Sequence, residues 1–129
     1  MYNEIRKLFA NDRFATQSDI QIAEIGEGYA KCTMPISEKH LNGNNTVMGG
    51  ALFTLGDLTF SVAANSHGTP AVSLNASISY IRPCSIGDEV TAEATEISRT
   101  RKIGLYKVSM HNKTGKLIAE MNGTAFFKE

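Results

Sequence analysis

One carboxylate stands apart from every other charged group in the sequence. Between His40 and Ile81 the only formally charged side chain is Asp57, in a chain of which 20% of the residues are charged. Such depletion predicts a buried segment. A buried carboxylate is unfavourable unless it is paired, hydrogen-bonded or protonated, and perturbed groups of this kind concentrate at functional sites. The alternative is a solvated or structurally satisfied aspartate, and this window alone leaves both open.

A glycine pair, Gly49-Gly50, lies where a polar loop becomes a helix. The first N–H groups of a helix have no partner within it and lie at the positive end of the helix dipole. They can bind a carbonyl oxygen, or the oxyanion that it becomes. The alternative is a pair of glycines that serves only a turn or close packing.

The spacing between the glycine pair and the carboxylate constrains any shared site. Asp57 follows Gly49 by eight positions, which is about 12 Å along an α-helix. One substrate carbon therefore cannot touch both residues of the same chain. If both act on one bond, the helix terminus of one subunit faces Asp57 of another across a two-fold interface. Gly56 lowers helix propensity by about 1 kcal/mol, and we interpret it as a place where a partner helix or a ligand approaches the backbone.

Other polar residues are weaker candidates. Asn42, in the loop before the helix, could orient a water or a carbonyl, although asparagine beside glycine commonly only forms a turn. Ser73 could hydrogen-bond Asp57, or could simply meet solvent. The local basic cluster Arg99, Arg101 and Lys102 could bind the phosphates of a nucleotide-bearing ligand, or could be a solvated basic turn.

Histidine and cysteine spacing indicates neither a metal nor a disulfide. His40, His67 and His111 have no spacing relation to one another or to a carboxylate cluster, so we assign none of them to metal. Cys32 and Cys84 form no C-x-x-C pair, which favours buried thiols in a reducing, cytoplasmic compartment.

Size and charge limit the class of protein. The 129 residues fit a single domain spanning 1–129. Thirteen basic and thirteen acidic residues balance, so no overall field recruits nucleic acid or an anionic membrane. We expect no signal peptide, because the N-terminus lacks an apolar core of the required length. We also expect no membrane-spanning helix, because the longest apolar run is too short and too polar to cross a bilayer.

The hydrophobic pattern predicts the elements that position these residues. A long helix from Gly49 to about Asn65, apolar on nearly every face, is expected to be buried nearly all round. The other predictions are a short helix over Tyr2–Ala10, two strands flanking Gly26–Gly28, a shaped loop over Ser37–Val47, and strands over Ala71–Ile81, Glu89–Ile97, Ile103–His111 and Leu117–Phe127. This succession favours an α+β architecture in which an antiparallel sheet wraps the central helix.

Two segments carry a family resemblance that covers roughly residues 15 to 128. HLNGNNTVMGGALFTLGDLTFSVAANSHG resembles the loop-and-helix signature of hotdog-fold acyl-CoA thioesterases of the phenylacetate-degradation (PaaI-like) branch. SISYIRPCSIGDEVTAEATEISRTRKIGLYKV is similar to that family's strand, Arg-Pro turn, Gly-Asp and strand succession. The resemblance implies the hotdog fold, an antiparallel β-sheet wrapped around a long central helix.

The family's functional residues carry over position by position. Asn42 matches the asparagine that helps place the water or thioester, and Gly49 the glycine whose N–H faces the thioester carbonyl. Asp57 matches the general base or nucleophile. Ser73 aligns with a polar residue that assists the carboxylate in some relatives.

The candidate substrate-binding residues lie around the helix entrance, in the Arg-Pro turn and in the basic cluster. They are Met48, Gly50, Arg82, Arg99, Arg101 and Lys102. Met48 stands where the family has a histidine, and Asn45 where it commonly has glycine. Methionine cannot donate a hydrogen bond to a thioester carbonyl, so we expect reduced activity or a substitute donor in the loop, Asn44 or Asn45.

The resemblance implies hydrolysis of acyl-CoA to free acid and CoA, with aryl- and medium-chain acyl groups as candidates. It also implies a homodimer or a dimer-of-dimers tetramer with active sites at the dimer interface, and no cofactor, because CoA is part of the substrate. Two alternatives stay open. One is a non-catalytic acyl-CoA binding or sensing protein. The other is hydratase chemistry, which would want a histidine–aspartate pair where the loop has Met48.

Overall fold

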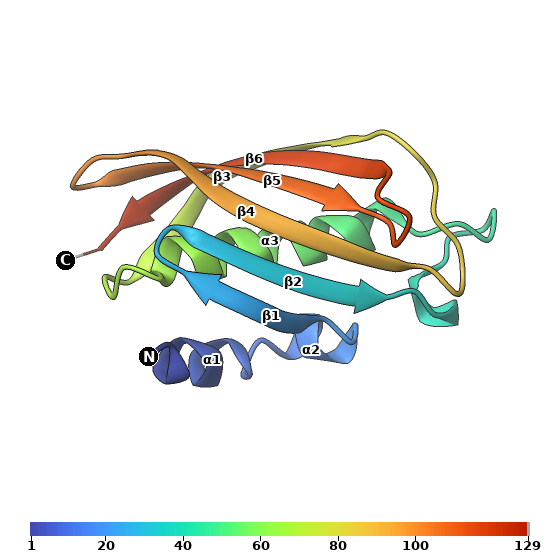
Figure 1. Ribbon diagram of the computed structural model, residues 1–129, viewed down its shortest axis with the longest axis horizontal. Coiled ribbons are helices and arrows are strands. Elements are labelled where there is room, and N and C mark those ends of the chain that lie inside the picture. Colours follow the sequence, from blue (N-terminus) through green and yellow to red (C-terminus); the bar gives the residue numbers. More distant parts are fainter. Residues whose placement is uncertain (129) are drawn as a thin grey trace.

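A curved antiparallel sheet wraps one long helix (Figure 1). The computed structural model describes residues 1–128. Its elements are α1 (Asn3–Phe9), α2 (Arg13–Gln17), β1 (Gln21–Gly26), β2 (Tyr29–Pro35), the 3-10 turn η1 (Glu38–His40), α3 (Gly49–Asn65), β3 (Ala71–Tyr80), β4 (Glu89–Arg99), β5 (Ile103–His111) and β6 (Leu117–Phe127). The predicted α+β architecture is confirmed.

The sheet has the strand order β1-β2-β4-β5-β6-β3, and every neighbouring pair is antiparallel. Strand β3, which directly follows the central helix, pairs with β6 at one edge of the sheet. Its other edge has no strand partner among residues 1–128. Several apolar side chains of this strand are exposed, including Val72 and Leu74. An exposed apolar edge strand is a ready surface for another chain.

Helix α3 provides the centre of the hydrophobic core. Leu55, Phe60 and Val62 are fully buried against the concave face of the sheet. The Phe60 ring packs at 5.4 Å, centroid to centroid, from the Tyr106 ring of β5. Because the helix carries no charge on its sheet-facing side, burial there costs no ion desolvation.

One stripe of α3 is less buried than the sequence pattern predicts. Gly50 is exposed, and Phe53, Thr54, Asp57 and Ser61 are only half-buried. Residues three or four positions apart share one face of a helix, so these five form a continuous stripe. The sheet curls over the other faces and the N-terminal segment covers this one only in part, so the expectation of burial nearly all round is not met within one chain.

Gly56 faces the sheet rather than a partner or a ligand. A Cβ at this position would lie 2.8 Å from Cε of Met121 and 2.9 Å from Cε of Met110. The interpretation of Gly56 as a point of approach for a second helix is therefore wrong. Two methionines of the same chain occupy the space instead.

The N-terminal region contains a second helical turn that the sequence pattern did not indicate. Helix α2 spans only Arg13–Gln17, and Ala15 is its one buried residue. Five residues are too few to show an apolar period, so this turn forms by docking on α3. Among residues 1–128, no helix combines the length and the apolar composition needed to cross a bilayer.

Replacement of two core glycines by alanine is expected to change the free energy of unfolding by different amounts. A Cβ at Gly123 would lie 2.8 Å from Cε2 of Phe60, a rigid ring, whereas a Cβ at Gly56 meets the flexible ends of two methionines. We expect Gly123→Ala to lower the free energy of unfolding by about 1–3 kcal/mol. Gly56→Ala should change it by less than about 1 kcal/mol, because alanine regains helix propensity.

Urea denaturation of the two variants, followed by circular dichroism, measures both values. Equal destabilisation by the two substitutions would contradict this account of how the core packs.

Candidate functional site

The entrance of α3 presents backbone N–H donors that bind no acceptor in the part of the chain that the structure describes. Met48 is the N-cap, with an extended backbone and no side-chain cap, and its carbonyl accepts the N–H of Ala51 at 3.0 Å. Within residues 1–128, the N–H groups of Gly49 and Gly50 have no hydrogen-bond acceptor. They lie at the positive end of a 17-residue helix. Such a terminus can bind a carbonyl oxygen that gains negative charge.

The loop before the helix is fastened to the rest of the fold by backbone bonds and one buried histidine. The Val47 N–H donates to the Cys84 carbonyl at 2.9 Å, and the Met48 N–H to the His40 carbonyl at 2.7 Å. His40 Nδ1 accepts the Ser37 N–H at 3.0 Å, and Nε2 lies 2.8 Å from the Ser18 carbonyl, to which it donates. His40 is thus a structural residue that fixes the helix entrance.

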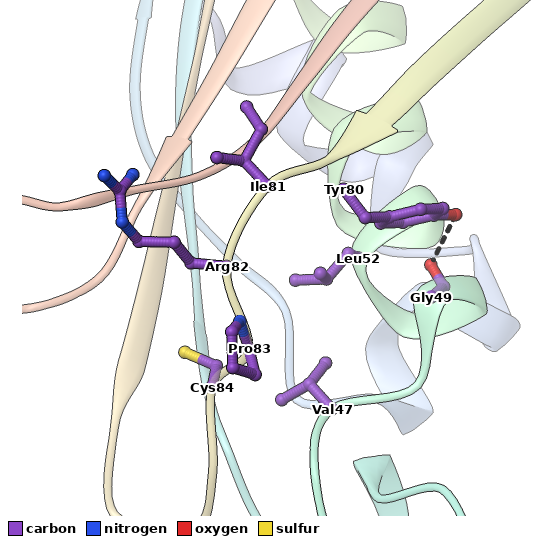
Figure 2. Close-up of a pocket in the computed structure, with 8 residues that line it drawn as sticks. All are labelled: Val47, Gly49, Leu52, Tyr80, Ile81, Arg82, Pro83 and Cys84. Carbon is purple, nitrogen blue, oxygen red and sulfur yellow. Dashed lines mark hydrogen bonds between the residues drawn. The ribbon is translucent and has the colours of Figure 1, made fainter.

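A cavity of about 320 Å³ opens beside Gly49 (Figure 2). It is lined by Val47, Gly49, Leu52, Tyr80, Ile81, Arg82, Pro83 and Cys84. The Tyr80 hydroxyl donates to the Gly49 carbonyl at 3.0 Å. The Arg82 guanidinium points away from the other lining residues (Figure 2) and donates to the Leu117 carbonyl at 2.9 Å. The lining is mostly apolar, which suits the uncharged part of a ligand.

Asp57 lies in a different cavity, of about 340 Å³, between α3 and the N-terminal segment. Its other lining residues are Asp12, Arg13, Phe14, Ala15, Phe53, Thr54 and Leu58. Burial, with a smaller contribution from the charge of Asp12, raises the pKa of Asp57 above its usual range. The cavities of Gly49 and Asp57 share no lining residue. A single chain therefore keeps these two predicted site residues apart, as the helix spacing requires.

Asn42 is engaged in its own loop. Its Oδ1 accepts the N–H groups of Asn44 at 2.8 Å and Thr46 at 3.2 Å, and its Nδ2 donates to Thr46 Oγ1 at 3.1 Å. Asn45 has a φ of 61°, a left-handed conformation that asparagine tolerates better than most residues. This explains how asparagine replaces the glycine common in the family. In one chain Asn42 lines neither the Gly49 cavity nor the Asp57 cavity.

Ser73 is exposed on β3, opposite Ala125 of β6 and next to a bulge in the strand. It is not among the residues that line the Asp57 cavity. Within one chain the structure thus does not bring this serine to the carboxylate.

The predicted basic cluster lies in the hairpin between β4 and β5, at the C-terminal end of α3 (Figure 1). The Arg99 guanidinium lies 4.9 Å from the centroid of the Phe127 ring, and Lys102 Nζ 5.6 Å from that of Phe126. Arg99 and Arg101 help to line a cavity of about 550 Å³. This end of the helix is remote from Gly49.

The structure contains a histidine–glutamate pair that the sequence did not predict. His67 Nε2 lies 2.7 Å from Glu96 Oε1, and the Tyr106 hydroxyl donates to the same oxygen at 2.6 Å. Burial alone would raise the pKa of Glu96, but the bonds from Tyr106 and His67 outweigh it, and the pKa is lowered. The partners lie on the α3–β3 connection and on β4, so no short sequence motif could have indicated them. The histidine spacing in the sequence shows no relation to a carboxylate cluster, and the contact of His67 with Glu96 joins residues 29 positions apart that only the fold brings together.

Comparison with known proteins agrees with this architecture. The family model described as "Thioesterase superfamily" matches residues 44–119. The chain is 34% identical over 116 residues to acyl-coenzyme A thioesterase PaaI of Escherichia coli, covering 90% of this chain and 83% of that protein. It is 31% identical over 104 residues to human acyl-coenzyme A thioesterase 13, covering 78% of this chain and 74% of that protein. The solved structure of the E. coli PaaI protein superimposes with a TM-score of 0.95 at 31% identity, covering 99% of this chain and 93% of that one.

The raised pKa of Asp57 predicts a stability signature. Because the folded chain disfavours the ionised form, stability is lost as the pH rises through the folded pKa and is fully present below the unfolded value of about 3.9. Asp57→Asn removes this penalty. We expect its thermal midpoint to exceed that of the wild type at neutral pH, and the difference to shrink as the pH approaches about 4.

Asp19→Asn is a matched control, because the fold lowers the pKa of Asp19 whereas it raises that of Asp57. The Asp19 carboxylate accepts from Lys39 Nζ at 2.6 Å, and this hydrogen bond and charge lower its pKa. Asparagine also tolerates its φ of 62°. This substitution should not raise the midpoint. A lower midpoint for Asp57→Asn than for the wild type at neutral pH would contradict the inferred burial of the carboxylate.

Proposed function

The chain belongs to the thioesterase superfamily, and from this membership and the geometry of α3 we propose that it hydrolyses acyl-CoA thioesters to the free acid and CoA. One observation carries the proposal: α3 begins with N–H donors at Gly49 and Gly50 that no acceptor in residues 1–128 binds, and it also carries a part-buried carboxylate, Asp57, as its only charged residue. The donors suit a developing oxyanion, and the carboxylate suits attack or proton removal.

Two chains are needed to combine these groups. We propose a homodimer in which the α3 stripe of Gly50, Phe53, Thr54, Asp57 and Ser61 packs against its counterpart, so that each Gly49 faces Asp57 of the partner subunit. The half-exposure of this stripe and the exposed apolar edge of β3 support such an interface. The tetramer expected from the family resemblance would be a pair of such dimers.

In the proposed reaction the thioester oxygen lies at the N–H groups of Gly49 and Gly50, which stabilise the negative charge as the carbonyl carbon becomes tetrahedral. In one route Asp57 of the partner subunit removes a proton from water, the hydroxyl adds to the carbon, and the C–S bond breaks as that proton passes from Asp57 to the departing sulfur, which leaves as the CoA thiol. In the other route its carboxylate adds directly and displaces CoA as the thiolate. Water then hydrolyses the resulting anhydride, and a proton from that water converts the thiolate to the CoA thiol. Both routes need ionised Asp57, and a raised pKa makes that carboxylate a stronger base.

The remaining predicted residues have supporting roles in this proposal. Asn42 would shape the loop that presents Gly49 and orient the attacking water, and Ser73 would assist Asp57 once two chains are paired. Arg99, Arg101 and Lys102, together with Arg82, would bind the CoA phosphates, for which guanidinium groups are suited.

The proposed reaction uses no cofactor, because every group that it needs belongs to the protein or to CoA. A cytoplasmic location is proposed because Cys32 and Cys84 are buried free thiols, which are typical of reducing compartments.

The second candidate function is acyl-CoA binding or sensing without turnover. Met48 favours this second function. The residue is 56% exposed at the helix entrance, at the position where the family has a histidine. Its thioether cannot donate a hydrogen bond to the substrate. We rank hydrolysis first because the Gly49 and Gly50 donors and Asp57 do not depend on that histidine.

A hydrolysis panel of short, medium, long and aromatic acyl-CoAs distinguishes the two functions. We expect the wild type to turn over at least one class, and Asp57→Asn to lower kcat by roughly 100-fold to 10,000-fold, because a general base or nucleophile is lost. Asp19→Asn makes the same chemical change on the surface and should leave the rate unchanged.

Isothermal titration calorimetry of the same proteins with each acyl-CoA provides the second measurement. Binding without any hydrolysis by the wild type would favour the sensor. Equal rates for the wild type and Asp57→Asn would contradict the catalytic role of the carboxylate.

A further inference from the structure

Tyr80, the last residue of β3, contacts the first residue of α3. Its hydroxyl donates to the Gly49 carbonyl at 3.0 Å, the bond drawn in Figure 2. Its ring also fills the space that a side chain at residue 49 would need, since a Cβ there would lie 2.9 Å from Cζ and 3.1 Å from Oη of Tyr80. At Gly50 a Cβ would meet nothing within 4 Å. The tyrosine therefore explains why residue 49 is glycine, and it leaves the space beside residue 50 open.

Within residues 1–128, no N-cap side chain fixes the first turn of α3 by a hydrogen bond. Met48 makes no capping bond, and two consecutive glycines have more backbone freedom than any other pair. A first turn of this composition would readily fray. The bond from Tyr80 ties it to β3, which is itself paired with β6.

The position of this bond matters for the donors. The carbonyl of Gly49 and the N–H of Gly50 belong to one planar peptide unit. A hydrogen bond to the oxygen therefore fixes the direction in which the N–H points. It also polarises the unit, which strengthens hydrogen bonds made by that N–H.

We propose that Tyr80 is a positioning residue of the thioester hydrolysis: by binding the Gly49 carbonyl it holds the Gly49–Gly50 peptide in the orientation that stabilises the oxyanion. This proposal rests on the proposed function. Tyr80 acts through the backbone of Gly49. Its ring stays in the wall of the cavity, 53% exposed, whether or not the hydroxyl bond is present.

Tyr80→Phe tests the proposal because it keeps the ring and removes only the hydroxyl. We expect kcat to fall about two- to tenfold, the factor that corresponds to one hydrogen bond. KM should stay within about twofold, because the cavity wall is unchanged, and the pH dependence should not move, because Tyr80 is not among the residues around Asp57.

Tyr29→Phe is the matched control. It removes a tyrosine hydroxyl that donates to Glu93 at 2.6 Å, between β2 and β4. It should leave kcat unchanged.

A spectroscopic readout separates positioning from a merely structural role. An acyl-CoA with an isotope-labelled carbonyl is bound to Asp57→Asn, which holds the thioester without rapid turnover, and its C=O stretching band is recorded by infrared difference spectroscopy. Donors that polarise the carbonyl lower this frequency. Adding Tyr80→Phe should move the band back toward its value in solution, whereas a purely structural role would change only the thermal midpoint.

The outcomes separate the two proposals. A wild type that hydrolyses no acyl-CoA overturns the proposed function, and the role of Tyr80 falls with it. A wild type that is active beside a Tyr80→Phe protein with the same kcat and the same carbonyl band overturns the role of Tyr80 alone. A twofold or larger loss of kcat with an unchanged KM and a shifted band supports it.

Discussion

The length of one uncharged helix is the constraint on which the rest of the structure depends. Helix α3 runs from Gly49 to Asn65, and its apolar faces must be buried, so a six-stranded sheet curls around it. The same helix carries, at its first residues, N–H donors that residues 1–128 leave without an acceptor, and its only carboxylate lies about 12 Å further along. A rigid helix cannot bring its own two functional groups together. A site that uses both requires a second copy.

The boundary of the sheet agrees with that requirement. The strand that follows the helix, β3, lies at an edge with apolar side chains exposed, and the helix keeps one half-buried stripe, which includes Asp57. A single chain thus leaves uncovered the surfaces that a partner would cover. Desolvation by a partner would raise the pKa of Asp57 further in the direction already present, since burial is the main cause of the shift.

The fold could be predicted from the sequence because its signals are local. The apolar run of α3 and the alternation in β4 and β5 depend on near neighbours, and the predicted bounds of α3 agree with the observed ones. Three contacts could not be predicted, because each joins residues that only the strand order and the curvature of the sheet bring together. They are Gly56 with Met121, His67 with Glu96, and Tyr80 with Gly49. Asp57 was found by the absence of other charges, a signal that Tyr80 does not carry.

Complementation between two inactive variants tests the shared site most directly. Asp57→Asn lacks the carboxylate, and Gly50→Pro lacks an N–H donor in the first helical turn, where proline is tolerated and where an added Cβ meets nothing within 4 Å. Each homodimer should be folded by circular dichroism and inactive. When the two variants are co-expressed in equal amounts, random pairing makes half of the dimers mixed. Each mixed dimer has one intact site out of two, so activity should recover to about one quarter of the wild-type value. Recovery to that level is the predicted result. No recovery, with mixed dimers demonstrated by differential tagging, would contradict the account and place the whole site within one chain.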